Sequence, residues 1–162
     1  PHMFGSMVAW SHAFGRAPIY LHEEYRPWVQ RPDPVIKFWG GDSRRLEAGL
    51  TLYRCGGHFS GSTVLWWPEG AEGRGVLLSS DTIYVVPDRR HVSFMFSYPN
   101  LIPLPPDVVD KIVATVMPLR FDRIYSHFVN LEITAGAKEA LRRSLRRYRQ
   151  ATGWPSPGGD DD

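Results

Sequence analysis

Three residues with metal-binding side chains stand where predicted strands end. His58 lies in the loop "GGHFSGS", between a strand expected over residues 51–54 and another over 63–67. Asp81 ends the strand "VLLSSD", and His127 ends "RIYSH". Zinc binds imidazole nitrogen and carboxylate oxygen readily, and in catalytic sites it lowers the pKa of a bound water to about 7. The three side chains therefore predict a metal centre that activates water.

Each of these residues also has an ordinary structural interpretation. A loop histidine usually has a structural role, an aspartate after a strand often caps a turn, and His127 has no glycine beside it. Cys55 lies close to His58 in the sequence, so it is either a soft metal ligand or a small buried hydrophobic residue. The alternation along its strand favours the buried residue.

The elements that position these residues are predicted from periodicity and turn signals. Apolar residues at helical spacing predict helices at 7–14, 107–117 and 135–150. Strands are expected over 51–54, 63–67 and 76–79, close enough in sequence to pair as one sheet under the two later helices. The aromatic, proline-punctuated stretch 82–106 is an excursion of the kind that often lines a site.

Composition limits the class of protein. With 162 residues and 43% hydrophobic content, the chain fits one domain with a buried core. The formal net charge of +2 is too small to argue for nucleic acid, and the single cysteine forms no intrachain disulfide. No apolar run approaches the roughly 18 residues of a membrane span, and no signal peptide opens the chain. We expect a cytoplasmic protein that acts on a small-molecule substrate, without nucleic-acid or membrane partners.

The order and spacing of these motifs resemble those of the metallo-β-lactamase-fold hydrolases. "GGHFSGS" looks like the family's Gly-His-Thr-Pro-Gly-Ser loop, "LLSSD" like its Leu-x-Gly-Asp, and "IYSH" like the strand that carries its last histidine. "GSMVAWSHAFGRAPIYLHEE" resembles the helix and strand that follow the family's first metal motif. The resemblance implies an α/β fold that is part of an αββα sandwich, with a mixed sheet and covering helices. This domain is expected over residues 1–150, before a disordered tail over 151–162.

The resemblance also implies a cofactor and a reaction. Zinc is expected, as one or two ions, with other divalent metals possible. His58 would ligate the first metal, Asp81 would bridge the ions and act in catalysis, and His127 would ligate the second. The reaction would be attack of metal-activated water on an ester, thioester, lactone or phosphoester. The alternative is a degenerate, non-catalytic domain of the same fold that serves binding or interaction.

The family's His-x-His-x-Asp-His motif is incomplete in this sequence. Only "PHMFG" precedes the first helix, so His2 takes the place of the second histidine, while Phe4 and Gly5 replace the aspartate and the last histidine. "PHM" can also be the remnant of a tag, which would remove His2. The chain thus looks like the C-terminal portion of such a protein. We expect a homodimer, or a missing N-terminal segment, to cover the open sheet and to be required for activity.

The remaining signals have simpler explanations. His12, His22 and His91 are interpreted as non-catalytic. The last predicted helix has a basic side that either binds phosphate or RNA, or is a solvated face whose late cations suit the helix C-terminus. We favour the solvated face. No Gly-x-Ser-x-Gly nucleophile elbow and no phosphate-binding loop is present in the sequence.

Overall fold

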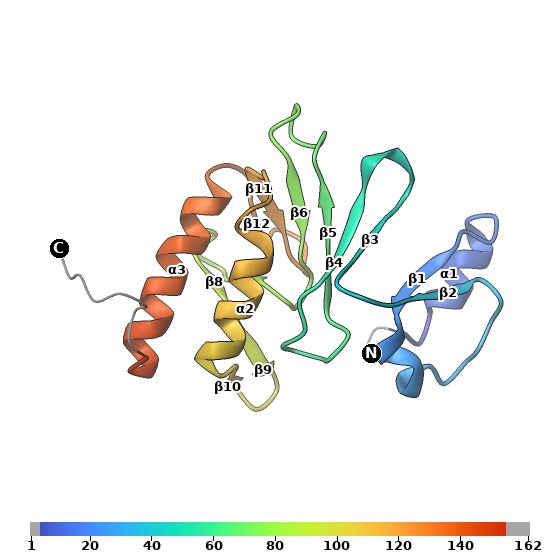
Figure 1. Cartoon of the computed structure of the whole chain (residues 1–162), viewed down its shortest axis with the longest axis horizontal. Coiled ribbons are helices and arrows are strands. Elements are labelled where there is room, and N and C mark those ends of the chain that lie inside the picture. Colours follow the sequence, from blue (N-terminus) through green and yellow to red (C-terminus); the bar gives the residue numbers. More distant parts are fainter. Residues whose placement is uncertain (1–3, 155–162) are drawn as a thin grey trace.

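The computed structural model describes residues 4–154, which form a mixed α/β fold (Figure 1). Its helices are α1 (Met7–Ala13), α2 (Pro106–Val116) and α3 (Ala137–Thr152), with short 3-10 helices η1 (Glu23–Trp28) and η2 (Glu47–Gly49). Its strands are β1 (Ile19–His22), β2 (Ile36–Trp39), β3 (Ser43–Arg45), β4 (Thr51–Arg54), β5 (Thr63–Trp67), β6 (Val76–Leu78), β7 (Tyr84–Val85), β8 (Val92–Ser93), β9 (Met95–Ser97), β10 (Ile102–Pro103), β11 (Arg123–Tyr125) and β12 (Glu132–Ile133).

The largest sheet contains the three strands that the sequence places together. Its strand order is β12-β11-β6-β5-β4-β3, so the prediction that β4, β5 and β6 share one sheet is confirmed. β5 is antiparallel to both β4 and β6, and β11 is parallel to β6. The carboxyl ends of β4, β6 and β11 therefore lie at the same end of the sheet. His58, Asp81 and His127 follow these three ends in the chain.

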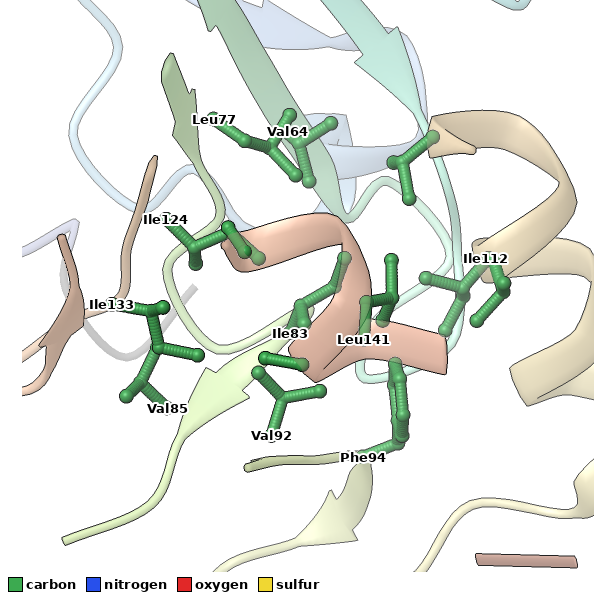
Figure 2. Packing of buried hydrophobic residues seen from close by; sticks show 14 of the residues in the cluster. Val64, Leu77, Ile83, Val85, Val92, Phe94, Ile112, Ile124, Ile133 and Leu141 are labelled. Atoms are coloured by element: carbon green, nitrogen blue, oxygen red, sulfur yellow. The ribbon is translucent and has the colours of Figure 1, made fainter. Parts of the chain in front are cut away.

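One face of this sheet is covered by α2 and α3, as the amphipathic patterns predict. Val64 and Leu77 of the sheet are fully buried in the same cluster as Ile112 of α2 and Leu141 of α3. Figure 2 shows these side chains around the fully buried Ile83, which lies between β6 and β7. Burying apolar side chains of this size stabilises a fold by about 1.5–3 kcal/mol each. This cluster is the main core of the chain.

The opposite face of the sheet is apolar but less covered. Leu52, Leu65, Leu78 and Tyr125 are consecutive cross-strand partners in the register of β4, β5, β6 and β11. Leu52 is buried, whereas Leu78 and Trp67 are 43% and 44% exposed. A row of large apolar side chains on a partly solvated face is typical of a surface that another layer covers.

A smaller unit lies at the β3 edge of the sheet, away from α2 and α3 (Figure 1). Here β1 and β2 pair in parallel, and α1 packs against them through Val8, Val35 and Ile36. The helix predicted over residues 7–14 is confirmed as α1, and the strand that the resemblance implies after it is confirmed as β1. η1 follows β1 directly, and its Tyr25 and Trp28 contact Phe59 in the loop between β4 and β5.

The ends of the chain and the long excursion differ in detail from the sequence prediction. α3 continues to Thr152, beyond the predicted boundary at residue 150. Residues 1–3 and 155–162 lie outside the described part of the chain, and they include His2 and most of the predicted tail. The excursion after Asp81 forms the short pairs β7–β8 and β9–β10. None of the helices within residues 4–154 is long and apolar enough to cross a membrane.

Candidate functional site

The loop between β4 and β5 folds back on itself around His58. The backbone N–H groups of Cys55 and Gly56 both donate to the Ser62 carbonyl, at 2.8 and 3.1 Å. The Ser62 hydroxyl in turn accepts from the backbone N–H of Phe59 at 2.9 Å. These hydrogen bonds close the loop on both sides of His58, so they fix the backbone position of His58.

The glycine before His58 is required by a close approach to the core. Gly57 has φ +86°, a region that L side chains rarely adopt. A Cβ atom there would lie 2.7 Å from Cδ1 of Ile112 and 3.0 Å from Cδ1 of Leu104. The loop therefore reaches its position against α2 only because residue 57 has no side chain.

The His58 ring is held in one orientation by a backbone carbonyl. Its Nδ1 lies 3.0 Å from the Met95 carbonyl oxygen. A carbonyl oxygen only accepts, so Nδ1 carries the proton and Nε2 of the neutral ring keeps its lone pair. Metal-binding histidines commonly show this arrangement, in which the ring nitrogen that does not bind the metal donates its N–H to a carbonyl oxygen. Nε2 is thus the accepting nitrogen of the neutral ring, and it is buried.

Asp81 lies in the turn that follows β6. The hydrogen bonds that close this turn come from its neighbours: the Ser79 hydroxyl donates to the Ile83 carbonyl at 2.6 Å, and the Thr82 N–H donates to the Ser79 carbonyl at 3.1 Å. These bonds close the turn around Asp81.

Tyr98 joins the two predicted site residues. Its hydroxyl donates to the backbone carbonyl of Asp81 at 3.2 Å, and its ring centroid lies 5.3 Å from that of His58 in an edge-to-face contact. The loop after β4 and the turn after β6 consequently meet at one tyrosine, which comes from the excursion between β6 and α2.

The charge of Asp81 contributes to a raised pKa at two tyrosines. Burial raises the pKa of Tyr98 well above its usual range, and the charges of Asp81 and Tyr84 raise it further. Burial also raises the pKa of Tyr25, against the lowering effect of its hydrogen bond with Ser62, and Asp81 adds to the increase. Both phenols stay protonated at neutral pH. The hydroxyl hydrogen of Tyr98 is donated to the Asp81 carbonyl, so it does not serve a second acceptor.

His127 lies at the same end of the sheet but in a more open setting. Its Nδ1 is 3.4 Å from the Ser80 hydroxyl, next to Asp81 in the chain, and its ring packs edge-on against the exposed Phe128 at 4.9 Å. Phe128 also contacts Tyr84, whose ring is 5.1 Å from Tyr98. A series of aromatic contacts thus links His127 to the surroundings of His58.

A metal ion needs several ligand side chains close together. Within residues 4–154, no three or more His, Cys, Asp or Glu side chains are grouped closely enough to hold a metal ion. His58, Asp81 and His127 share the end of the sheet without forming such a group, and His2 lies outside the described part. The described residues therefore do not fit a metal ion by themselves, and the metal-ligand assignment stays a prediction.

The other singled-out residues have structural partners. His12 lies 3.1 Å from Asp33, and His91 lies 2.7 Å from Asp88. His22 is buried, with Nε2 3.1 Å from the Gly41 carbonyl, and its Nδ1 accepts from the Glu24 N–H at the start of η1.

Cys55 packs against the main core, and burial raises its thiol pKa to about 12. A thiolate, the form that binds metal, is therefore disfavoured there.

The basic side of α3 is largely engaged within the chain. Arg149 forms an ion pair with Asp110 at 2.7 Å, Arg142 pairs with Glu139 at 3.2 Å, and Arg143 donates to the Arg90 carbonyl. These contacts hold the guanidinium groups of Arg142, Arg143 and Arg149 against other groups of the chain.

Sequence reasoning missed the tyrosines of this site. The excursion over 82–106 is of the kind that often lines a site, but nothing in its sequence singles out Tyr98. Tyr25 belongs to a proline-containing stretch that showed no motif. The available signal was the aromatic content of both stretches, which does not say which ring faces the sheet.

Comparison with known proteins gives one relative. Over 151 residues the chain is 49% identical to Uncharacterized protein YmaE of Bacillus subtilis (strain 168), an alignment that covers 93% of this chain and 54% of YmaE. The chain thus spans about half the length of this relative. No protein-family profile and no solved structure matches the chain.

Proposed function

We propose that this chain is a metal-dependent hydrolase that resembles the metallo-β-lactamase-fold enzymes, with an ester, thioester, lactone or phosphoester as substrate. The supporting observation is that the loop with His58 and the turn with Asp81 meet at Tyr98, at the end of the sheet where three parallel strands finish. Sequence motifs in the order and spacing of that family lead to the same residues.

The chain's own residues have definable tasks in such a reaction. The Met95 carbonyl orients the His58 ring and leaves Nε2 as the accepting nitrogen of the neutral imidazole. Tyr25, which stays protonated, can donate to the oxygen on which negative charge develops. A metal ion at this site would need ligands beyond the described residues, since no three His, Cys, Asp or Glu side chains within residues 4–154 are grouped closely enough to hold one.

The first test measures metal and activity in the same sample. We expect the purified 162-residue chain to retain about one zinc per chain in elemental analysis. We also expect it to hydrolyse at least one of p-nitrophenyl acetate, an acylthioester, a γ-lactone or bis-p-nitrophenyl phosphate. EDTA should remove the activity, and zinc should restore it. A folded chain that retains no zinc and hydrolyses none of these compounds contradicts the proposal.

The second candidate function is a non-catalytic binding or interaction domain. It is favoured by the lack of a grouped three-ligand set among the described residues. The same measurement separates the two candidates, because a binding domain should remain folded and inactive whether zinc or EDTA is added.

The proposal includes a layer over the open face of the sheet, formed by a second copy or by a further segment. Leu78 and Trp67 are exposed there beside the half-buried Leu65. Light scattering on the eluting chain should give about twice the 18.5 kDa of one chain. Leu78→Gln should shift the mass toward one chain, whereas Leu101→Gln, at an exposed leucine in the β9–β10 turn, should not. A monomer that binds no hydrophobic dye contradicts this part.

A further inference from the structure

A pocket of about 450 Å³ lies beside the candidate site, on the side of η1 and the start of α1. Its apolar walls are the rings of Phe4, Trp28 and Phe59, with Met7, and its polar lining includes Gln30 and Arg31. This volume is within the range of small-molecule sites, which are mostly apolar with a few polar groups that orient the ligand.

The pocket shares a wall with the candidate site. Phe59 follows His58 in the chain, and its ring centroid lies 4.6 Å from the imidazole. The same ring lies 5.5 Å from Trp28 in an edge-to-face contact. A ligand that packs on the Phe59 ring from the pocket is therefore separated from His58 by that ring.

The polar side of the pocket carries an available positive charge. Arg31 is exposed and makes no ion pair with any residue of the described range 4–154. The nearby carboxylate of Asp33 is already used, since it accepts from the Val35 N–H at 2.9 Å and lies within 4.0 Å of both His12 and Arg16. A guanidinium recognises a carboxylate through two parallel hydrogen bonds, so an anionic ligand is the matching partner.

We propose that this pocket binds a small aromatic carboxylate, with its ring packed against the pocket-lining rings of Trp28 and Phe59 and the carboxylate on Arg31. The inference rests on the proposed function in one respect: it takes such a carboxylate as the acid product of the ester or thioester that is hydrolysed. The binding itself is independent of any hydrolysis.

The test compares phenylacetate with phenylacetamide, which has the same shape and no charge. In calorimetric or ligand-observed NMR titrations of the 162-residue chain, phenylacetate should bind at least about tenfold more tightly than the amide. Arg31→Gln should bring the acid to the affinity of the amide, and Trp28→Ala should weaken both. Arg146→Gln, at an exposed arginine on α3, should change neither affinity.

Several outcomes overturn the inference. They are equal binding of acid and amide, unchanged binding in Arg31→Gln, or no binding of either compound to a folded chain. Failure of the proposed function looks different. A chain that binds phenylacetate through Arg31 but hydrolyses no substrate supports this pocket and contradicts the hydrolase proposal. A chain that hydrolyses a substrate but does not bind phenylacetate supports the hydrolase proposal and contradicts this substrate class.

Discussion

Replacing His58 with asparagine should lower kcat/KM for hydrolysis about a thousandfold without unfolding the chain. General-base groups contribute typically 10²–10⁴-fold to a rate. Asparagine has an amide N–H at the position of Nδ1, so the contact with the Met95 carbonyl that orients the native imidazole at 3.0 Å has a replacement. It has no basic nitrogen, however, and so it can neither accept a proton from water nor replace a metal-binding imidazole nitrogen.

The matched control is His91→Asn. His91 also makes one side-chain contact, with Asp88 at 2.7 Å, but it lies after β7 and away from the site. Its kcat/KM should stay within about twofold of the parent value, and urea unfolding of both variants should show that each is folded. If the His58 variant keeps its activity, or if both variants lose it equally, His58 has no catalytic task.

Local sequence patterns were sufficient for the elements that make up the core. The segment over 63–67 alternates so that Val64 is fully buried and Trp67 is exposed, and the turns that bound it lie at glycines. α2 and α3 follow from apolar spacing in the same way. Because β4, β5 and β6 are joined by short connections, their antiparallel order also follows, and with it the common end for His58 and Asp81.

The details of the site depend on contacts between distant parts of the chain. Tyr98 reaches His58 from 40 positions further along the sequence, and the Met95 carbonyl belongs to a strand of three residues that has no distinctive pattern. Two- and three-residue strands carry too few positions for alternation to be recognised. Such tertiary contacts set the direction of a side chain that follows a strand. This explains why His58, Asp81 and His127 lie at one end of the sheet without forming a metal-ligand group.

Gly57→Ala should lower the free energy of unfolding by about 3 kcal/mol. Two costs add at this position. Backbone strain at φ +86° costs a non-glycine residue about 1–2 kcal/mol. The new methyl group would also lie 2.7 Å from Cδ1 of Ile112, and overpacking of a buried side chain typically costs about 1–3 kcal/mol. The midpoint of urea unfolding measures the loss, provided that the slope is unchanged.

Gly49→Ala separates the two costs. Gly49 also has positive φ, at +75°, but a Cβ atom there would meet nothing within 4 Å. Its substitution should therefore show the backbone strain alone, about 1–2 kcal/mol. The difference between the two variants measures how tightly the His58 loop is pressed against α2. Further replacement of Ile112 by valine in the Gly57→Ala chain should recover part of the loss, since it removes the Cδ1 atom that the methyl group meets. Equal losses for the two glycine variants would mean that the loop stands clear of α2, and the close approach that positions His58 would not exist.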